Sequence, residues 1–387
     1  MLIVILVLFL NIALILFPNT AMSAARDGLK LWLDNILPAL LPFAVGVNVL
    51  SGVGFTRFLG VLLEPVMQPL FRVPGAGGFA LVTGLVSGSP LGAKVTADMR
   101  AEGLLTKREA RRLAGFANCC GPLFVIGVVG VGLFKDAAAG YFLYIVHLLG
   151  ALAVGFVFRG FGKSGRTGGG KRILGRAGLE MSYGREKNGS IGLILGTSVM
   201  NAMETMLLIG GYVMLFSVII GIFRETGLFG VFAGIIPWDV PEGAAIGFIE
   251  MTSGVKSLGA GQEQFKKALI TAAGVISWGG LCIHAQSLGF IGKTDIGALP
   301  YLAGKMLHAA FAVGLAVLLY PLYTGLNGRA LPAGFFSPSS AGIMKPALDG
   351  LKTSLSLFAV SVALLTVFAL IIYVAAKKRG KRPNPHV

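Results

Sequence analysis

The polar side chains with the clearest chemical potential in this chain lie beside glycines and prolines that interrupt apolar stretches. Glu250 stands out, because an ionisable group inside an apolar segment is costly to bury and by default marks a functional site. The predicted substrate-binding residues fall in four interrupted stretches and are Ser87, Ser89 and Lys94; Asn118 and Cys120; Glu250, Thr252 and Ser253; and Ser277, His284 and Gln286. For the small hydroxyl groups, helix packing or capping is the competing interpretation, since serine and threonine are common where membrane helices meet.

These groups suit the recognition of an anion. A helix that starts at a break directs amide protons and the positive end of its dipole into the adjoining space, which favours a carboxylate. Lys94 would add a positive charge, and Glu250 would act either as a proton- or cation-coupling group or as a partner of Lys94 or Lys256. Asn201 and Glu204, at i and i+3 of a helix entering the second half, are either neighbours of the same site or interfacial residues.

Motifs for catalysis, metals and cofactors do not combine into a site. The segment 165–171 begins like a phosphate-binding loop, but Arg172 stands where a Ser or Thr would hold magnesium, and no buried strand precedes it. The sequence contains neither an H-E-x-x-H nor a G-x-S-x-G motif, and Cys119, Cys120 and Cys282 have no zinc or disulfide spacing. We therefore expect no enzymatic activity, no bound metal and no cofactor.

The composition places these residues in a membrane protein. Of 387 residues, 55% are hydrophobic and 13% are charged, against about 25% charged residues in an ordinary soluble domain. The mean hydropathy is +0.80. Eight apolar stretches approach the roughly 20 residues that a spanning helix needs, and they are 2–17, 37–55, 113–134, 137–158, 206–223, 269–291, 299–320 and 355–376. The predicted fold is an all-α polytopic membrane protein with about eight transmembrane helices.

Two further apolar stretches, 75–94 and 231–258, are too broken to cross the membrane. In the first, Pro90 lacks an amide proton and disfavours helix at the residue before it. The expected breaks are 87–90 in the first stretch and Pro237, Pro241 and Gly254 in the second. Broken backbone at membrane depth is tolerated only where it lines protein or a water-filled cavity, so both stretches are predicted to be re-entrant helical hairpins.

The two hairpins belong to two halves with one plan. Each is followed by a helix interrupted at a glycine, Gly121 or Gly280, and then by an apolar helix with one histidine, His147 or His308. Three crossings per half turn the second half over, and inverted repeats are typical of secondary transporters with a site at the membrane midplane. The predicted divisions are 1–35, an N-terminal helix and an interfacial amphipathic helix at 26–36; 36–158, the first repeat; 159–189, a basic cytoplasmic loop; 190–322, the second, inverted repeat; and 323–387, a loop, the last transmembrane helix and a basic tail.

Charge sets the orientation and the partners. The segment 159–187 holds eight lysines and arginines against two glutamates, and the tail from Lys377 to Arg382 holds five basic residues. Basic segments beside apolar helices are typically cytoplasmic and meet anionic lipid headgroups, so both termini are predicted to be cytoplasmic and nucleic-acid binding is not expected. The loop at 135–136 and the loop 324–352 are predicted on the opposite face. The expected partners are membrane lipids and a small anionic substrate, and a homo-oligomer is left open.

Four motifs together carry a family resemblance, and they are 37–43 (LPALLPF), 84–94 (GLVSGSPLGAK), 118–122 (NCCGP) and 247–254 (GFIEMTSG). The chain resembles the nucleoside recognition (Gate) superfamily, and most closely its sporulation integral membrane proteins of the YlbJ (SpoVV) group. The resemblance implies a bacterial membrane protein with a fold like the core of concentrative nucleoside transporters. It also implies a role in endospore formation, the passage of dipicolinic acid across the outer forespore membrane.

Two other functions stay open. A nucleoside or nucleobase transporter coupled to protons or sodium would use Glu250 for coupling or ribose binding. Nucleoside transporters of this architecture read the base and ribose with Gln, Glu and Asn side chains in both hairpins, whereas the first hairpin tip here offers Ser87 and Ser89, which favours the small anion. A non-transporting membrane scaffold would use the basic loop and tail to hold partners, and it would have no need of polar broken backbone at membrane depth.

We expect a cysteine at position 170, in a chain without the three native cysteines, to react with a membrane-impermeant thiol reagent from the cytoplasmic side. The positive charge of 159–187 and the crossings that precede it require this orientation. Labelling of sealed and permeabilised cells measures the side of reaction. Reaction from the non-cytoplasmic side would contradict both the topology and the inverted repeat.

Overall fold

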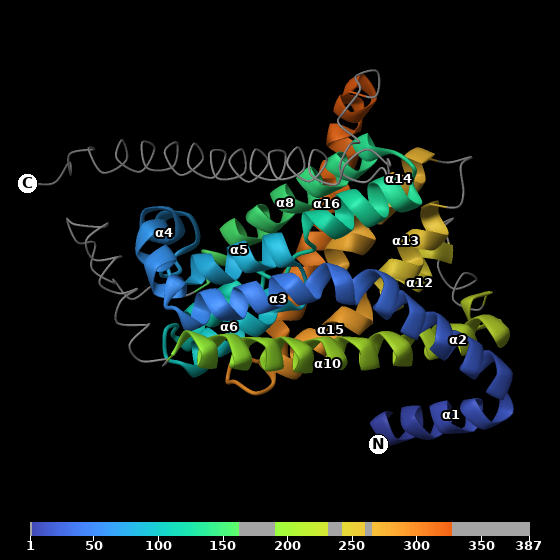
Figure 1. The fold of residues 1–387 in the computed structure, drawn as a ribbon. Coiled ribbons are helices and arrows are strands. Elements are labelled where there is room, and N and C mark those ends of the chain that lie inside the picture. Colours follow the sequence, from blue (N-terminus) through green and yellow to red (C-terminus); the bar gives the residue numbers. More distant parts are fainter. Residues whose placement is uncertain (1, 162–189, 231–241, 260–264, 327–387) are drawn as a thin grey trace, which may run out of the picture.

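The computed structural model describes residues 2–161, 190–230, 242–259 and 265–326, and each regular element in these ranges is a helix (Figure 1). The fold of the described part is therefore all-α, as predicted. The elements are α1 (Leu2–Leu16), α2 (Pro18–Leu31), the π-helical η1 (Trp32–Ile36), α3 (Leu37–Gly52), α4 (Phe55–Phe71), α5 (Gly77–Ser87), α6 (Leu91–Ala101), α7 (Lys107–Ala114), the π-helical η2 (Leu123–Leu133), α8 (Ala137–Phe158), α10 (Ile191–Glu225), α12 (Glu242–Ile249), α13 (Met251–Gly259), α14 (Phe265–Trp278), α15 (Gly280–Ile291) and α16 (Ala298–Leu326).

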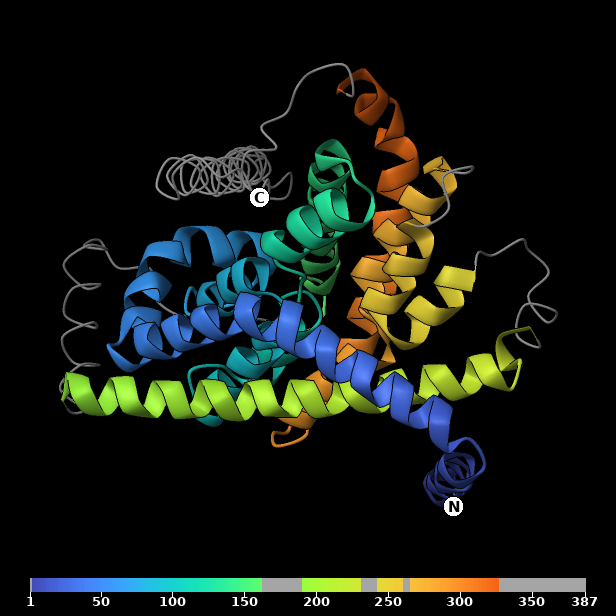
Figure 2. The ribbon, with the colours of Figure 1, turned by 45° about the vertical axis from the view of Figure 1, so that its right-hand side comes forward.

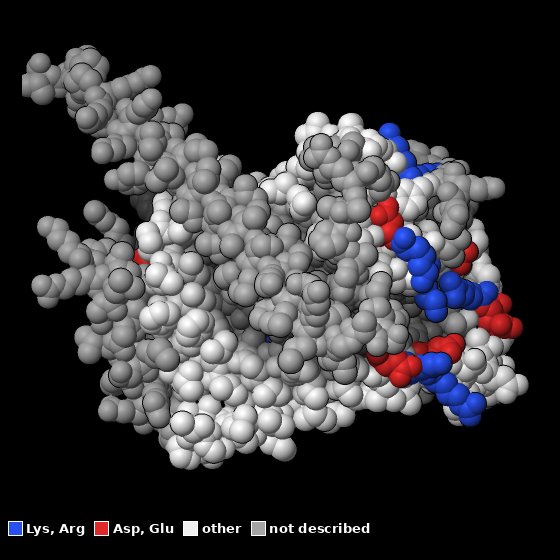
Figure 3. Space-filling model, turned by 45° about the horizontal axis from the view of Figure 1, so that its top comes forward, with Lys and Arg blue, Asp and Glu red and all other residues white. Residues whose placement is uncertain are grey.

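Four helical segments of the described part are long and apolar enough to cross a membrane. They are α8, α10, the joined helices α14 and α15 (Phe265–Ile291), and most of α16 (Ala298–Pro321). A fifth candidate is the pair of α1 and α2, which bend by 108° relative to each other. On the face drawn in Figure 3, most of the charged side chains gather at one end of the molecule. Eight crossings stay a prediction, and the stretch 355–376 lies outside the residues that the structure describes.

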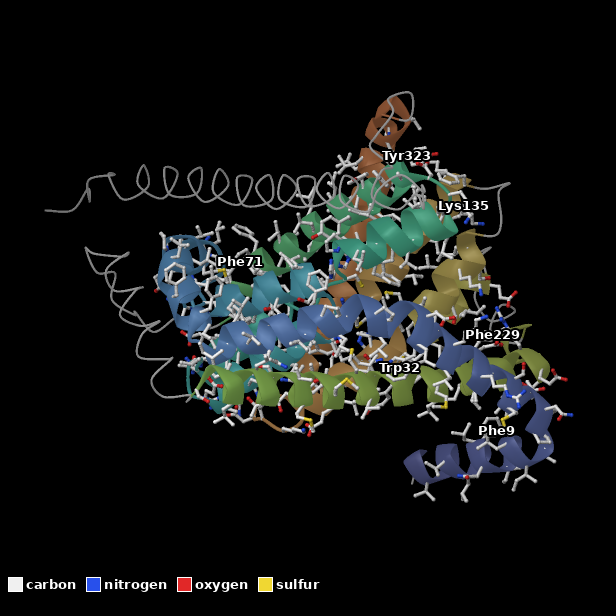
Figure 4. All side chains as sticks on the ribbon, viewed as in Figure 1. Phe9, Trp32, Phe71, Lys135, Phe229 and Tyr323 are labelled. Atoms are coloured by element: carbon white, nitrogen blue, oxygen red, sulfur yellow. The ribbon has the colours of Figure 1, made fainter. Side chains whose placement is uncertain are left out.

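The N-terminal helices form one side of the molecule together with α10. α2 and α3, joined by η1, run beside α10 in both ribbon views (Figures 1 and 2). The buried Trp32 anchors this contact, because its indole nitrogen donates to the carbonyl of Met206 at 3.1 Å (Figure 4). The segment 26–36 is thus helical, as predicted, and continues into α3, while its place in the membrane interface stays a prediction.

The first half contains the predicted break. α5 ends at Ser87, Gly88 takes a φ of +89°, and α6 starts directly after Pro90. α5 and α6 then pack against each other as a pair. The sequence pattern from Thr106 to Glu109 predicts a capping box at the next helix. The structure has it, since the Thr106 hydroxyl accepts from the Glu109 amide and the Glu109 carboxylate accepts from the Thr106 amide.

The apolar stretch 113–134 is not one spanning helix, which corrects the sequence prediction. Irregular backbone separates α7 from η2 over residues 115–122, a stretch that we call the unwound segment. The carbonyl of Ala117 lies so close to α5 and α6 that a Cβ at Gly84 or Gly92 would overlap it. Close packing against the α5–α6 pair thus holds this segment in a non-helical form, and it starts well before the glycine-proline break at its end.

The second half breaks at Glu250 and not at Gly254, which is a second correction. Glu250 is the residue between α12 and α13, whereas Gly254 lies inside α13. A Cβ at Gly254 would overlap the backbone of Gly247 on α12, so this glycine allows two helices to approach closely. The other expected breaks, Pro237 and Pro241, lie outside the described residues.

The interruption predicted at Gly280 is confirmed and separates α14 from α15. Gly279 and Gly280 have φ values of +90° and +79°, in the left-handed region that residues with a Cβ rarely adopt. A Cβ at Gly280 would also stand only 3.0 Å from the carbonyl oxygen of Ile249. This interruption therefore lies directly against the break between α12 and α13.

Each helix pair ends beside a segment of the other half. At the end of α6, Arg100 donates two hydrogen bonds of 2.8 and 2.9 Å to Asp295 in the loop between α15 and α16. These bonds from the guanidinium lower the pKa of the Asp295 carboxyl to about 2. At the end of α13, a Cβ at Gly259 would stand 3.1 Å from the carbonyl oxygen of Leu133, the last residue of η2. The two halves thus contact each other reciprocally.

We expect Gly254→Ala to destabilise the protein by about 1–3 kcal/mol, the usual cost of overpacking a close contact. Gly211→Ala is the matched control, because Gly211 lies in α10 and a Cβ there meets nothing within 4 Å. That control should change the stability by less than about 1 kcal/mol, in the stabilising direction, since alanine favours helix. Thermal unfolding of the purified variants in detergent measures both, and equal effects would contradict the close approach of α12 and α13.

Candidate functional site

The break between α5 and α6 and the break between α12 and α13 meet at one cavity of about 90 Å³. Apolar residues of η1, α3, η2 and α10 form a large part of its wall. The predicted site residues that line it are Ser87, Ser89, Cys120, Glu250, Thr252 and Gln286. The volume is below the roughly 300–1,000 Å³ of sites for drug-sized ligands. A ring-sized substrate therefore requires the helix pairs to move apart.

The unwound segment forms the cavity wall on the side of the first half. The hydroxyl of Ser89 donates to the carbonyl of Cys119 at 2.8 Å, and the amide of Cys120 donates to Nε2 of His147 at 2.9 Å. Gly121 packs against the end of α5, where a Cβ would stand 2.7 Å from the carbonyl oxygen of Val86. Side chains from other elements thus satisfy the backbone groups that the missing helix leaves unpaired.

Glu250 caps α13 on the side of the second half. Its side chain is 3% exposed, and its two carboxylate oxygens accept from the amides of Thr252 at 2.8 Å and Ser253 at 2.7 Å. The amides at this helix start, which the sequence analysis assigned to a substrate carboxylate, are therefore occupied by a carboxylate of the protein itself. These amides, and not Lys94 or Lys256, supply its hydrogen bonds.

Five predicted site residues do not line the cavity, and they are Lys94, Asn118, Ser253, Ser277 and His284. Lys94 lies one turn into α6, and its ammonium pairs with Asp98 at 2.8 Å. Asn201 and Glu204 are exposed on α10 and also lie outside the cavity wall. Substrate binding by all these residues, and by the six that line the cavity, stays a prediction.

Several of the residues outside the cavity form a buried polar layer behind the unwound segment. We use the term polar layer for Asn118, His147, Ser277, His284, Ser287, Tyr301, Lys305 and His308, which are at most 3% exposed. The side-chain amide of Asn118 donates to the hydroxyls of Ser287 at 3.0 Å and Tyr301 at 3.2 Å. Nδ1 of His284 lies 3.0 Å from the Tyr301 hydroxyl. The layer joins the unwound segment of the first half to α15 and α16 of the second.

The polar layer also includes five residues that were not predicted to belong to the site, and they are His147, Ser287, Tyr301, Lys305 and His308. Lys305 donates from its ammonium to the carbonyl of Asn118 at 3.1 Å. His147 and His308 stack with ring centroids 4.5 Å apart, and Nε2 of His308 donates to the carbonyl of His147 at 2.8 Å. In the sequence, the two histidines occupy corresponding positions of the two predicted halves. The signal for Lys305 was a lysine inside the predicted span 299–320, which is rare by the same argument that selected Glu250.

One cluster in this layer has the residue types of a metal site. The ligand atoms of Cys119, His147 and His308 lie within 4.8 Å of one another. However, Nε2 of His147 accepts from the amide of Cys120, so its Nδ1 carries the proton that faces Ser277 at 2.9 Å. His147 thus has no free lone pair, and the cluster does not fit a metal ion.

A family model matches the part of the chain that contains the first break. Residues 33–136, which include the first break and the unwound segment, match the model of the Gate family, described as "Nucleoside recognition". The class of protein is therefore a helical membrane protein with a nucleoside recognition domain.

The chain belongs to the family of the sporulation integral membrane protein YlbJ. It is 35% identical over 340 residues to that protein of Bacillus subtilis (strain 168), which covers 82% of each chain. A shorter match of 99 residues, at 32% identity, joins 25% of this chain to 19% of an uncharacterized protein of Alkalihalophilus pseudofirmus. No solved structure matches the chain. The family and the apolar helices together identify an integral membrane protein of sporulation.

The native cysteines test the cavity directly. We expect a chain that retains Cys120 alone to react with a small methanethiosulfonate about tenfold faster than a chain that retains Cys119 alone, since thiol reactivity follows access. Cys120 lines the cavity, whereas Cys119 is fully buried and bonded to the carbonyl of Phe116. Mass spectrometry of the time course measures the two rates. Faster reaction of Cys119 would mean that the accessible space lies on the Cys119 side of the unwound segment, and it would contradict the position of the cavity.

Proposed function

We propose that this protein is a secondary transporter of a small organic anion and that the cavity is its central binding site. The observation that carries the proposal is the meeting of two helix breaks, one from each half, at a single cavity with polar groups on both sides. Paired broken helices around a central site are typical of secondary transporters. A membrane scaffold has no comparable need for them.

The contacts between the halves support an inverted repeat of two re-entrant hairpins, with a fold similar to the core of concentrative nucleoside transporters. The end of α6 lies at the loop after α15, and the end of α13 lies at the end of η2. α6 and α13 occupy corresponding positions in the two halves, and so do the end of η2 and the end of α15. Each of the two helices therefore contacts the equivalent place in the other half. An inverted repeat about a pseudo-two-fold axis produces this exchange.

Glu250 supplies a route to proton coupling. An ionised Glu250 occupies the amides of Thr252 and Ser253. A substrate carboxylate can take these amides only after Glu250 has lost its charge, because two carboxylates at one place repel each other. Binding of the anion would then require a proton on Glu250, and the two would cross the membrane together.

The substrate that we propose is dipicolinic acid, carried across the outer forespore membrane, with both termini in the cytoplasm. The sporulation family supports this choice, and a planar aromatic dicarboxylate suits a cavity with an apolar wall and polar ends. Nucleoside transport is the second candidate. The name of the matching family model favours it, as do Glu250 and Gln286 in the cavity wall, which can hydrogen-bond ribose hydroxyls.

We expect proteoliposomes that contain the protein to take up radiolabelled dipicolinate faster than uridine. An acidic exterior should raise the uptake, since a one-unit pH gradient drives about tenfold accumulation for one coupled proton. Glu250→Gln should transport without a response to the gradient, because the amide cannot exchange a proton. Glu225→Gln, on an exposed residue at the end of α10, is the matched control and should keep the response.

Uptake of uridine in preference to dipicolinate would favour the nucleoside alternative. Uptake of neither compound by a protein that unfolds cooperatively in detergent would contradict the transporter proposal. A pH response that survives Glu250→Gln would remove Glu250 from the coupling role.

A further inference from the structure

Lys305 is an ammonium buried in the middle of the polar layer without a counter-ion. Its side chain is 1% exposed, and none of the ion pairs found among the described residues includes it. An ammonium has three donors, and the hydrogen bond given for Lys305 is the one to the carbonyl of Asn118 at 3.1 Å. Burying a charge is costly unless a partner of opposite sign compensates it. An anion from outside the described chain would supply that partner.

The ammonium lies just behind the wall of the cavity. Asn118, whose carbonyl holds it, is two residues before Cys120, which lines the cavity. Two extended residues span at most about 7 Å, so this carbonyl and the cavity wall are close neighbours. In an apolar interior a charge acts over such a distance with little screening.

An anion in the cavity needs a positive charge that the described lining residues do not supply. Glu250 is the charged side chain among the lining residues that the structure describes, and once it has taken a proton to admit the anion, no charged side chain is left in the wall to attract the anion. Lys94, the cation that the sequence analysis assigned to the substrate, is paired with Asp98 outside the cavity. Without a further positive charge, the cavity would offer an anion only neutral donors such as the amides at the start of α13.

We propose that Lys305 is the specificity-determining cation of the site and makes the cavity accept a small carboxylate anion. The bound anion is the counter-ion that the described residues do not supply to Lys305. Lys305 acts from behind the unwound segment. The hydrogen bonds of that segment to Ser89 and His147 hold it in place between the Lys305 ammonium and the bound anion. This inference rests on the proposed function, of which it names the recognition element.

The test compares Lys305→Gln, Lys305→Met and Lys305→Arg with the wild-type protein. Calorimetric titration with dipicolinate and with uridine in detergent gives the affinities, and uptake into proteoliposomes gives KM and maximal rate. We expect Lys305→Gln and Lys305→Met to weaken dipicolinate binding at least tenfold and to leave the response to uridine unchanged or improved. Lys305→Arg should retain dipicolinate binding within about threefold, because the charge remains. Lys266→Gln, on an exposed lysine of α14, is the matched control and should behave as wild type.

Thermal stability separates recognition from a structural role. Lys305→Met removes the cost of burying a charge together with the hydrogen bond to the carbonyl of Asn118, and because these two effects oppose each other, Tm should stay close to the wild-type value. A Tm that falls in all three variants, with dipicolinate and uridine affected equally, would assign Lys305 to folding and overturn the proposal. Unchanged dipicolinate affinity in Lys305→Gln, with loss in Lys94→Gln, would move the recognition to Lys94 and overturn it as well. Wild-type protein that binds no anion would instead disprove the proposed function, and the inference with it.

Discussion

Unpaired backbone groups in an apolar interior are the constraint on which the rest of this structure depends. Each break in a helix frees amides and carbonyls that no water can reach at membrane depth. The protein supplies a partner at each place: the Glu250 carboxylate for the start of α13, His147 for the amide of Cys120, and Ser89 for the carbonyl of Cys119. Lys305 does the same for the carbonyl of Asn118. These polar residues of the core are therefore tied to the irregular backbone, which also lines the cavity.

The local breaks could be predicted from sequence because their causes are local. Pro90 cannot donate a hydrogen bond to a helix, and a glycine pair such as Gly279 and Gly280 can take a positive φ. The residue types alone therefore indicate these breaks. The same holds for the box formed by Thr106 and Glu109. Five of the six predicted site residues that line the cavity lie at a break or within two residues of one, and Gln286 lies further along α15.

The errors have tertiary causes. Gly254 was expected to break a helix, yet it permits α13 to touch α12, and both uses of a glycine look alike in a sequence. The stretch 113–134 is apolar enough for a spanning helix, but Ala117 is wedged between glycines of α5 and α6 that are distant along the chain. Lys94 lies outside the cavity wall and pairs with Asp98 one helical turn away, which is a local contact, and its role in substrate binding stays a prediction. Lys305 was passed over because its partner is a backbone carbonyl nearly two hundred residues away.

The contact between His147 and His308 has a mechanical consequence. These residues join α8 to α16, one helix from each half, through stacked rings and a hydrogen bond from an imidazole to a main-chain carbonyl. Sliding one helix along the other would break that bond in a place without water to replace it. We therefore expect α8 and α16 to keep their relative position. Movements that admit a solute should be easier for the short helices around them, such as α6, whose end is held by the exposed ion pair of Arg100 with Asp295. The molecule should thus be stiffer at its centre than at its rim.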